Sequence, residues 1–199
     1  MRRTILAVLA LFAVLALPHV ANAEPKPKKK LYFTGGGAVD FGNGAIGKHP
    51  ALLTLPAQPT QGFDDIFGKG FSFNGYFGGP IMDNVSLQVG YTGEFHSGKA
   101  VDLEAHWFLA ELKFNPRLGR IDPYVLGGIG AAVGNIKASG VAANIDTNVE
   151  FAYTFAGGVD IYVTDLIALQ PEVRVRSIKD SGIWVYPVSL GMNVLFLFE

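Results

Sequence analysis

Residues 183–198 read IWVYPVSLGMNVLFLF, and this stretch decides the fold. From Trp184 to Phe198 every second residue is large and apolar, whereas the positions between them include Ser189, Gly191 and Asn193. Successive side chains of a β-strand point to opposite faces. The stretch therefore predicts a strand with one wholly apolar face and one mixed face.

The apolar face carries aromatic residues at both of its ends. Trp184 and Tyr186 lie at one end, and Phe196 and Phe198 lie at the other. An apolar band flanked by aromatic girdles is typical of strands that cross a bilayer in a closed barrel. A half-buried strand of a soluble sheet is the alternative, although its large residues would be hidden and its polar ones exposed.

The same alternation recurs in seven earlier segments. They lie near residues 31–41, 70–78, 85–95, 101–114, 123–133, 149–163 and 167–178. Eight is an even number of strands and the smallest usual for a membrane barrel. Closing the sheet leaves no unpaired edge in lipid. We therefore expect an all-β fold, an eight-stranded antiparallel up-and-down transmembrane β-barrel over residues 31–199.

The segment 101–114 is ambiguous. Its apolar face, followed toward the N-terminus, meets His106, Glu104 and Asp102. We interpret these residues as an extension of the sheet beyond the bilayer. A β-bulge near Trp107 is the alternative.

The connections between the segments differ in length. Gly79-Pro80 and residues 82–84 predict a short turn, whereas residues 42–69 and 134–148 predict long connections. Short periplasmic turns and longer external loops are expected of such barrels.

The chain begins with a pattern typical of export. Arg2 and Arg3 precede the apolar run 5–17, and Ala21-Asn22-Ala23 is a small-residue cleavage site. We expect residues 1–23 to be a signal peptide and residues 24–30, EPKPKKK, to be a flexible basic leader. A run of thirteen apolar residues would span about 20 Å as a helix, too short for a bilayer.

Composition excludes several functions. The net charge is −1, and removal of Arg2 and Arg3 lowers the 16 basic residues to 14 against 17 acidic ones, a net charge of −3. No basic footprint for nucleic acid is present. Cys is absent, which excludes disulfides and thiolate metal sites. We expect no cofactor.

The face opposite the apolar one carries charges in several segments. An isolated buried charge is costly, so nearly balanced signs favour a network of ion pairs in the barrel interior. The predicted network comprises four acids and three bases: Glu94, Glu111, Lys113, Asp160, Glu172, Arg174 and Arg176. Because eight-stranded interiors are usually filled, we interpret it as a polar plug; a narrow channel or small-solute path is the alternative.

One cluster has the composition of a hydrolase site. His96 and Ser97 lie close to Asp102, Glu104 and His106. Adjacent residues of a strand point to opposite faces, so His96 and Ser97 do not predict a nucleophile and its base. The spacing of Asp102, Glu104 and His106 could also suit a divalent metal, but we interpret these residues as a solvated face and predict no catalytic or metal site.

Three motifs resemble the OmpA-like, opacity-type outer-membrane barrels of Gram-negative bacteria. They are DPYVLGGIG at 122–130, AGGVD at 156–160 followed by EVRVR at 172–176, and the aromatic final strand. The resemblance implies location in the outer membrane, contact with lipid and lipopolysaccharide, insertion by the assembly machinery and a monomeric state.

These observations favour a structural or surface-interaction protein and not an enzyme. A narrow channel or a small-solute or lipid-binding barrel is the alternative. An outer-membrane lipid-modifying enzyme is a further one, although the lipid A deacylases of this kind carry His-x-Ser where this chain has His96-Ser97.

Overall fold

The computed structural model describes residues 31–43, 68–98, 101–116, 118–138, 144–146, 148–180 and 183–198. The predicted signal peptide and leader, residues 1–30, lie outside this part. The strands are β1 (Tyr32–Asn43), β2 (Gly70–Met82), β3 (Val85–Ser97), β4 (Val101–Phe114), β5 (Ile121–Ala138), β6 (Asn144–Asp146), β7 (Glu150–Tyr162), β8 (Ile167–Asp180) and β9 (Ile183–Leu197).

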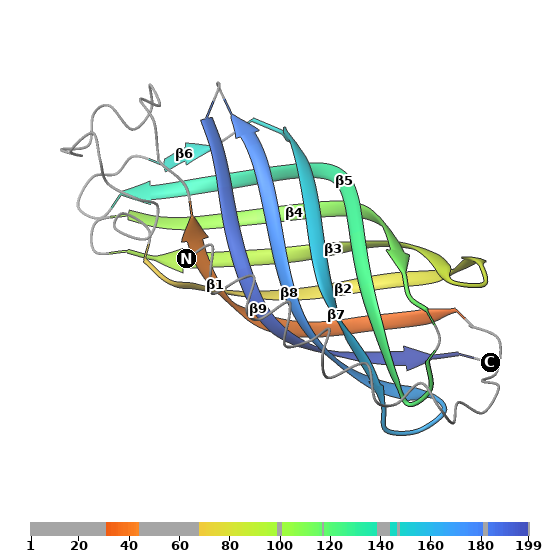
Figure 1. Ribbon diagram of the computed structural model, residues 1–199. Coiled ribbons are helices and arrows are strands. Elements are labelled where there is room, and N and C mark those ends of the chain that lie inside the picture. Colours follow the sequence, from red (N-terminus) through yellow and green to blue (C-terminus); the bar gives the residue numbers. More distant parts are fainter. Residues whose placement is uncertain are drawn as a thin grey trace.

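The sheet closes on itself. Each long strand pairs antiparallel with the next, β4 pairs with β5, and β1 pairs with β9 from Tyr32↔Leu197 to Asn43↔Tyr186 (Figure 1). The three-residue β6 adds only to one end of β5, where Asn144 faces Lys137. Eight long strands therefore form the barrel, and the predicted fold class is confirmed.

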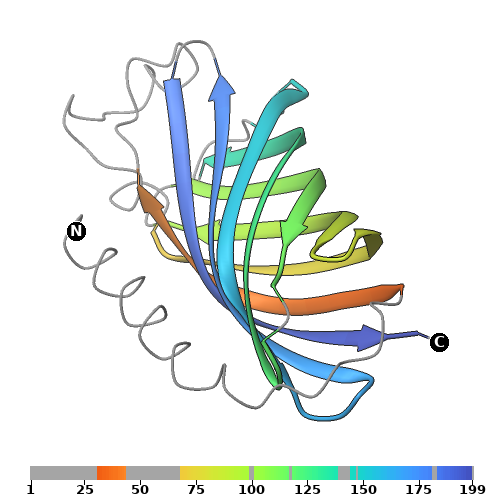
Figure 2. The ribbon, with the colours of Figure 1, turned by 45° about the vertical axis from the view of Figure 1, so that its right-hand side comes forward.

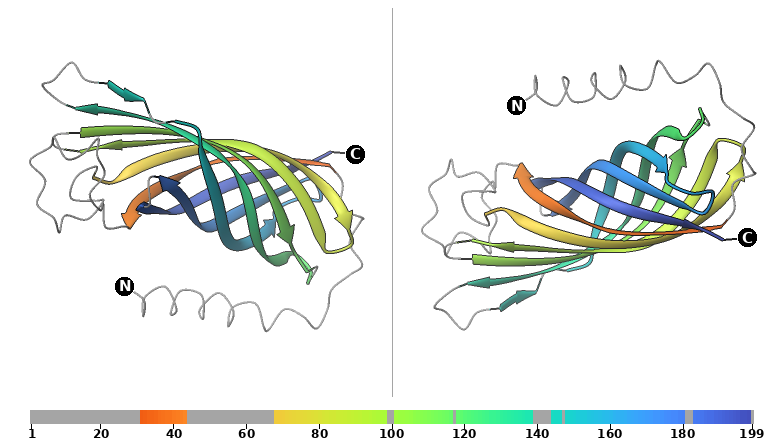
Figure 3. Two further views of the ribbon diagram at one scale, coloured as in Figure 1. Left: turned by 90° about the horizontal axis from the view of Figure 1, so that it is seen from above. Right: turned by 90° about the horizontal axis from the view of Figure 1, so that it is seen from below.

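The two ends of the barrel differ. Tyr32 and Leu197 lie at one end, which we call the terminal end, together with the connections β2–β3, β4–β5 and β7–β8 (Figure 2). The other end, the loop end, carries the connections β1–β2, β3–β4, β5–β7 and β8–β9. In both views of Figure 3 the strands run obliquely around a common interior, as closure of a twisted sheet requires.

Apolar side chains face outward and polar ones inward. On β7, Phe155 is 72% exposed while its neighbour Thr154 is 1% exposed; on β5, Val125 is 57% exposed. This pattern is the reverse of that in a soluble protein and suits a lipid solvent. Phe196 and Phe198 belong to the exposed set, whereas the side chains of Trp184 and Tyr186 lie outside the described ones. No helix in the described ranges is long and apolar enough to cross a membrane.

The ambiguity of the fourth segment is resolved by its register. β3 and β4 pair without a shift from Val85↔Phe114 to Ser97↔Asp102, so there is no bulge at Trp107. β5 pairs with the whole of β4 and has 18 residues, more than the roughly 9–11 that a tilted strand needs to cross a bilayer. We call the band of outward-facing apolar side chains the apolar belt. The loop-end parts of β4 and β5 therefore extend beyond this belt.

Two predicted connections were wrong in extent. Gly79 and Pro80 belong to β2, where they face Leu87 and Ser86, and the register shifts only between Pro80 and Met82. A proline lacks the N–H for a ladder bond and is tolerated beside such an irregularity. Residues 134–138 continue β5, because β4 and β6 supply partners that extend the ladder beyond the apolar alternation.

Glycines make room for large lumen residues. A Cβ on Gly158 would lie 2.7 Å from the Tyr124 hydroxyl and still closer to the Pro171 carbonyl oxygen. A Cβ on the adjacent Gly157 would meet only the Tyr124 carbonyl oxygen, at 3.7 Å. Pairing small and large residues is a usual way to fill a small barrel.

We predict that Gly158→Ala lowers the free energy of unfolding by about 1–3 kcal/mol, because the methyl group overpacks the Tyr124 site. Urea unfolding of the barrel in lipid vesicles, followed by tryptophan fluorescence, measures the change. Gly157→Ala is the matched control and should leave the midpoint nearly unchanged. Equal effects of the two substitutions would contradict the packing described here.

Candidate functional site in the barrel interior

The structure places all seven residues of the predicted network inside the barrel. Each is at most 7% exposed, and together they come from four strands: Glu94 from β3, Glu111 and Lys113 from β4, Asp160 from β7, and Glu172, Arg174 and Arg176 from β8. The strict two-residue period of these strands brings them to one face. They form three groups along the barrel.

The central group is built around Arg174. Its Nη1 contacts Glu111 across the lumen, and its Nε donates to Glu172 Oε1 at 2.8 Å. The Tyr76 hydroxyl accepts from Arg174 Nη1 at 2.9 Å, and the Tyr124 hydroxyl donates to Glu172 Oε2 at 2.9 Å. The guanidinium and its partner Glu172 thus connect β2, β4, β5 and β8.

A second group lies toward the terminal end. Lys113 Nζ lies 2.9 Å from both carboxylate oxygens of Asp160, and Gln170 donates to the same carboxylate at 2.6 Å. The ammonium also lies 3.9 Å from the centroid of the Tyr124 ring, within cation–π range. This ion pair is therefore held from several sides.

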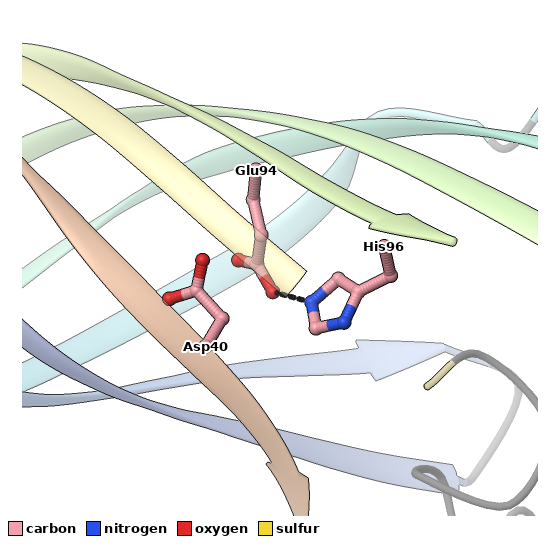
Figure 4. A group of neighbouring side chains, drawn as sticks. All are labelled: Asp40, Glu94 and His96. Atoms are coloured by element: carbon pink, nitrogen blue, oxygen red, sulfur yellow. Dashed lines mark hydrogen bonds and ion pairs between the residues drawn. The ribbon is translucent and has the colours of Figure 1, made fainter. Parts of the chain in front are cut away.

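The third group lies near the loop end, and we call Asp40, Glu94, His96 and Arg176 the loop-end cluster. Figure 4 shows the first three of these residues. Arg176 Nη1 lies 3.3 Å from Glu94 Oε2 and 3.8 Å from Asp40 Oδ1. His96 Nε2 lies 2.7 Å from Glu94 Oε1, and its Nδ1 lies 3.2 Å from the Gly68 carbonyl oxygen. Every member of the cluster is at most 2% exposed.

Two hydroxyls hold the Asp40 carboxylate in this cluster. Ser72 donates to Asp40 Oδ1 at 3.1 Å, and Ser189 donates to the same oxygen. Arg176 Nη1 in turn donates to Ser189 Oγ at 2.9 Å. The cluster is therefore a continuous chain of bonds between β1, β2, β3, β8 and β9.

Among the described residues, two buried aspartates and one buried histidine were missing from the predicted network: Asp40, His96 and Asp122. Asp40 shares its parity with Thr34, and His96 shares its parity with Glu94, so the alternation itself could have found both. Asp122 instead stabilises the β4–β5 connection, because its Oδ1 accepts hydrogen bonds from the backbone N–H groups of Leu118 and Gly119.

His96 and Ser97 point to opposite sides of β3. His96 lies in the lumen, while the exposed Ser97 donates from Oγ to Asp102 Oδ1 at 2.8 Å on the outer side. On that outer side His106 Nε2 lies 3.2 Å from Glu104 Oε1, and its Nδ1 lies 2.6 Å from the Tyr91 hydroxyl. The sequence cluster is therefore divided by the barrel wall, and no Ser–His pair is formed by these residues.

A small cavity remains beside the central group. Its lining includes Tyr76, Gln88, Lys113, Glu172 and Arg174, and it has room for about one water molecule. Gln88 donates to Glu111 at 2.6 Å and accepts from the Tyr32 hydroxyl at 2.9 Å. The lumen at this level is occupied by mutually bonded side chains.

Comparison with known protein sequences identifies one outer-membrane relative. No protein-family model matches the chain. A 22 kDa outer membrane protein of Rhizobium leguminosarum bv. viciae is 26% identical over 178 residues, which cover 83% of this chain and 76% of the relative.

Two solved structures show the shared fold. Neisserial surface protein A superposes with a TM-score of 0.65 at 16% identity, over 84% of this chain and 97% of that one. Ail, the attachment invasion locus protein of Yersinia pestis solved with the heparin analogue sucrose octasulfate, has a TM-score of 0.52 at 11% identity, over 85% and 100% of the two chains. The chain is thus an outer-membrane protein with the eight-stranded fold of the small OmpA-like barrels of Gram-negative bacteria.

Proposed function

We propose that the protein is a closed, non-conducting barrel with a structural or surface-interaction role. The observation that carries this proposal is the placement of Arg174 between Glu111 and Glu172 in the middle of the lumen. The guanidinium and its partners join strands on different sides of the barrel. A permeating ion would have to separate these charges in a medium of low dielectric, which costs several kcal/mol for each ion.

The groups on either side of Arg174 support the same role. Lys113 with Asp160 closes the lumen toward the terminal end, and Arg176 with Glu94 closes it toward the loop end. Filled interiors are usual for barrels of this size. The function would then belong to the outer surface and the loops, because the charge pairs of the described residues block the interior at three levels.

We further propose that the terminal end faces the periplasm, since both long connections, β1–β2 and β5–β7, lie at the loop end and those at the terminal end are all short. Export would use the signal peptide at 1–23, and insertion would use the assembly machinery reading β9. The apolar belt would contact lipid, and the exposed Lys137 beyond it would contact lipopolysaccharide phosphates. Closure of the sheet within one chain is compatible with a monomer.

We propose no enzymatic activity. A nucleophile needs a base within hydrogen-bond reach, and His96 lies in the lumen while Ser97 lies outside. Unchanged lipid A in a strain lacking the protein is the expected result. A lipid A product that disappears with the gene and returns with the intact chain would contradict this proposal.

We expect the native barrel, reconstituted in planar bilayers, to show no steady conductance. The reason is that the paired charges of the described lumen residues would obstruct a continuous water path. Heat-denatured protein and detergent alone serve as controls for bilayer damage. A steady native conductance that changes on Arg174→Ala would instead support the narrow channel.

We expect Arg174→Ala to lower the free energy of unfolding by about 3–5 kcal/mol, because it leaves Glu111 and Glu172 buried without their cation. Lys137→Ala is the control. Its pair with Glu104 spans 3.4 Å on the outer surface, and exposed pairs contribute about 0–1 kcal/mol. Urea unfolding in lipid vesicles measures both variants. A small effect at Arg174 would mean that the bridge does not support the fold.

A further inference from the structure

We propose that the loop-end cluster is a divalent transition-metal site, with Asp40, Glu94 and His96 as its ligands and Zn²⁺ as the best-suited ion. Each residue offers one ligand atom, and these three atoms lie within 4.8 Å of one another. Ligand atoms around a tetrahedral Zn²⁺ lie about 3.4 Å apart, given metal–ligand distances near 2.1 Å. Small side-chain rotations therefore suffice to close the site.

The donor set favours this class of ion. One imidazole nitrogen and two carboxylate oxygens suit Zn²⁺ and its neighbours, whereas Ca²⁺ and Mg²⁺ prefer oxygen ligands alone. Two carboxylates and one neutral imidazole also match the charge of the ion. Figure 4 shows the Glu94 carboxylate between the Asp40 carboxylate and the His96 ring, to which it is bonded.

Each carboxylate is anchored through one oxygen. Asp40 Oδ1 accepts from Ser72 and Ser189, whereas Asp40 Oδ2 is buried and has no hydrogen-bond partner in the described part of the chain. Glu94 Oε2 is held by Arg176, which leaves Oε1 facing His96 Nε2. A buried carboxylate oxygen without a partner is costly, and a cation would remove that cost.

His96 is oriented as a metal ligand would be. Its Nδ1 lies 3.2 Å from the Gly68 carbonyl oxygen, so Nδ1–H can donate there and leave Nε2 for a metal. Metal-bound imidazoles usually donate their second N–H to a carbonyl or carboxylate in this way. Metal binding needs Nε2 as a lone-pair donor, so the ion would take the place of the 2.7 Å contact between His96 Nε2 and Glu94 Oε1.

A glycine makes room for the His96 ring beside the two carboxylates. Gly70 of β2 faces Asp40 on one side and His96 on the other in the strand ladder. A Cβ on Gly70 would lie 2.6 Å from His96 Nδ1 and 2.7 Å from its Cε1. The imidazole therefore lies over a position without a side chain, between the strands that carry the two carboxylates.

Arg176 does not contact the carboxylate oxygens that are left for the metal, Asp40 Oδ2 and Glu94 Oε1. It contacts Glu94 Oε2 and Asp40 Oδ1, the anchored oxygens, and Ser189. Its positive charge lowers the affinity for a cation but holds both carboxylates in place. A site of this kind would join β1 to β3 and fix the loop end of the lumen.

The test uses untagged chain from residue 24 onward, refolded in detergent free of lipopolysaccharide, with and without ZnCl₂. We expect about one Zn²⁺ per folded barrel after desalting, measured by elemental analysis, and a higher unfolding temperature with Zn²⁺. Asp40→Asn and His96→Gln should each abolish stoichiometric binding. Ser189→Ala, which loosens Asp40, should weaken binding about tenfold.

Controls separate this site from other histidines. His106→Gln alters the outer side of β4, where His106 pairs with Glu104, and His49→Gln alters a residue outside the described part. Both variants should bind Zn²⁺ as the native chain does. Heat-modifiable gel mobility shows that each variant is folded. Absence of bound Zn²⁺ in folded native barrel would overturn the proposal and leave the cluster as an ion-pair network. Binding that survives His96→Gln and is lost with His106→Gln would also overturn it.

Discussion

Closure of the backbone hydrogen-bond ladder is the constraint on which the rest of this structure depends. Lipid offers no partner to a free N–H or C=O group, so each strand must be bonded on both sides. The pairing of β1 with β9 and of β4 with β5 satisfies this requirement around the ring. Once the ring is closed, every strand has one face to lipid and one to a narrow interior.

That interior has to satisfy its own polar groups. Eight strands leave space for side chains and little else, so charges placed there must meet partners from the opposite wall. Arg174 does this with Glu111, Lys113 with Asp160, and Arg176 with Glu94. Tyrosines lying beside glycines, such as Tyr124 beside Gly158, fill the remaining space.

The carboxylates of Asp160 and Asp40, toward the two ends of the interior, differ in how completely they are hydrogen-bonded. Both oxygens of Asp160, toward the terminal end, face Lys113, and Gln170 adds a further donor. At the loop end Asp40 Oδ2 accepts no bond within the described residues, and a histidine lies nearby. The unsatisfied oxygen and the imidazole make the loop end the place where a ligand would add most to the barrel.

The sequence by itself determined the strand number, the membrane-facing parity and the inward position of the seven charged residues, because a two-residue period assigns a face without knowledge of the partners. It could not determine which charges meet, since Arg174 and Glu111 are 63 residues apart and their contact depends on register. The same period already placed His96 and Ser97 on opposite faces of their strand. Only the tertiary structure brought Asp40, on the first strand, to Glu94 and His96 on the third. The physical reason is that the closure and stagger of the sheet decide which residues of different strands lie at the same level of the barrel. Both are properties of the whole sheet and not of one strand.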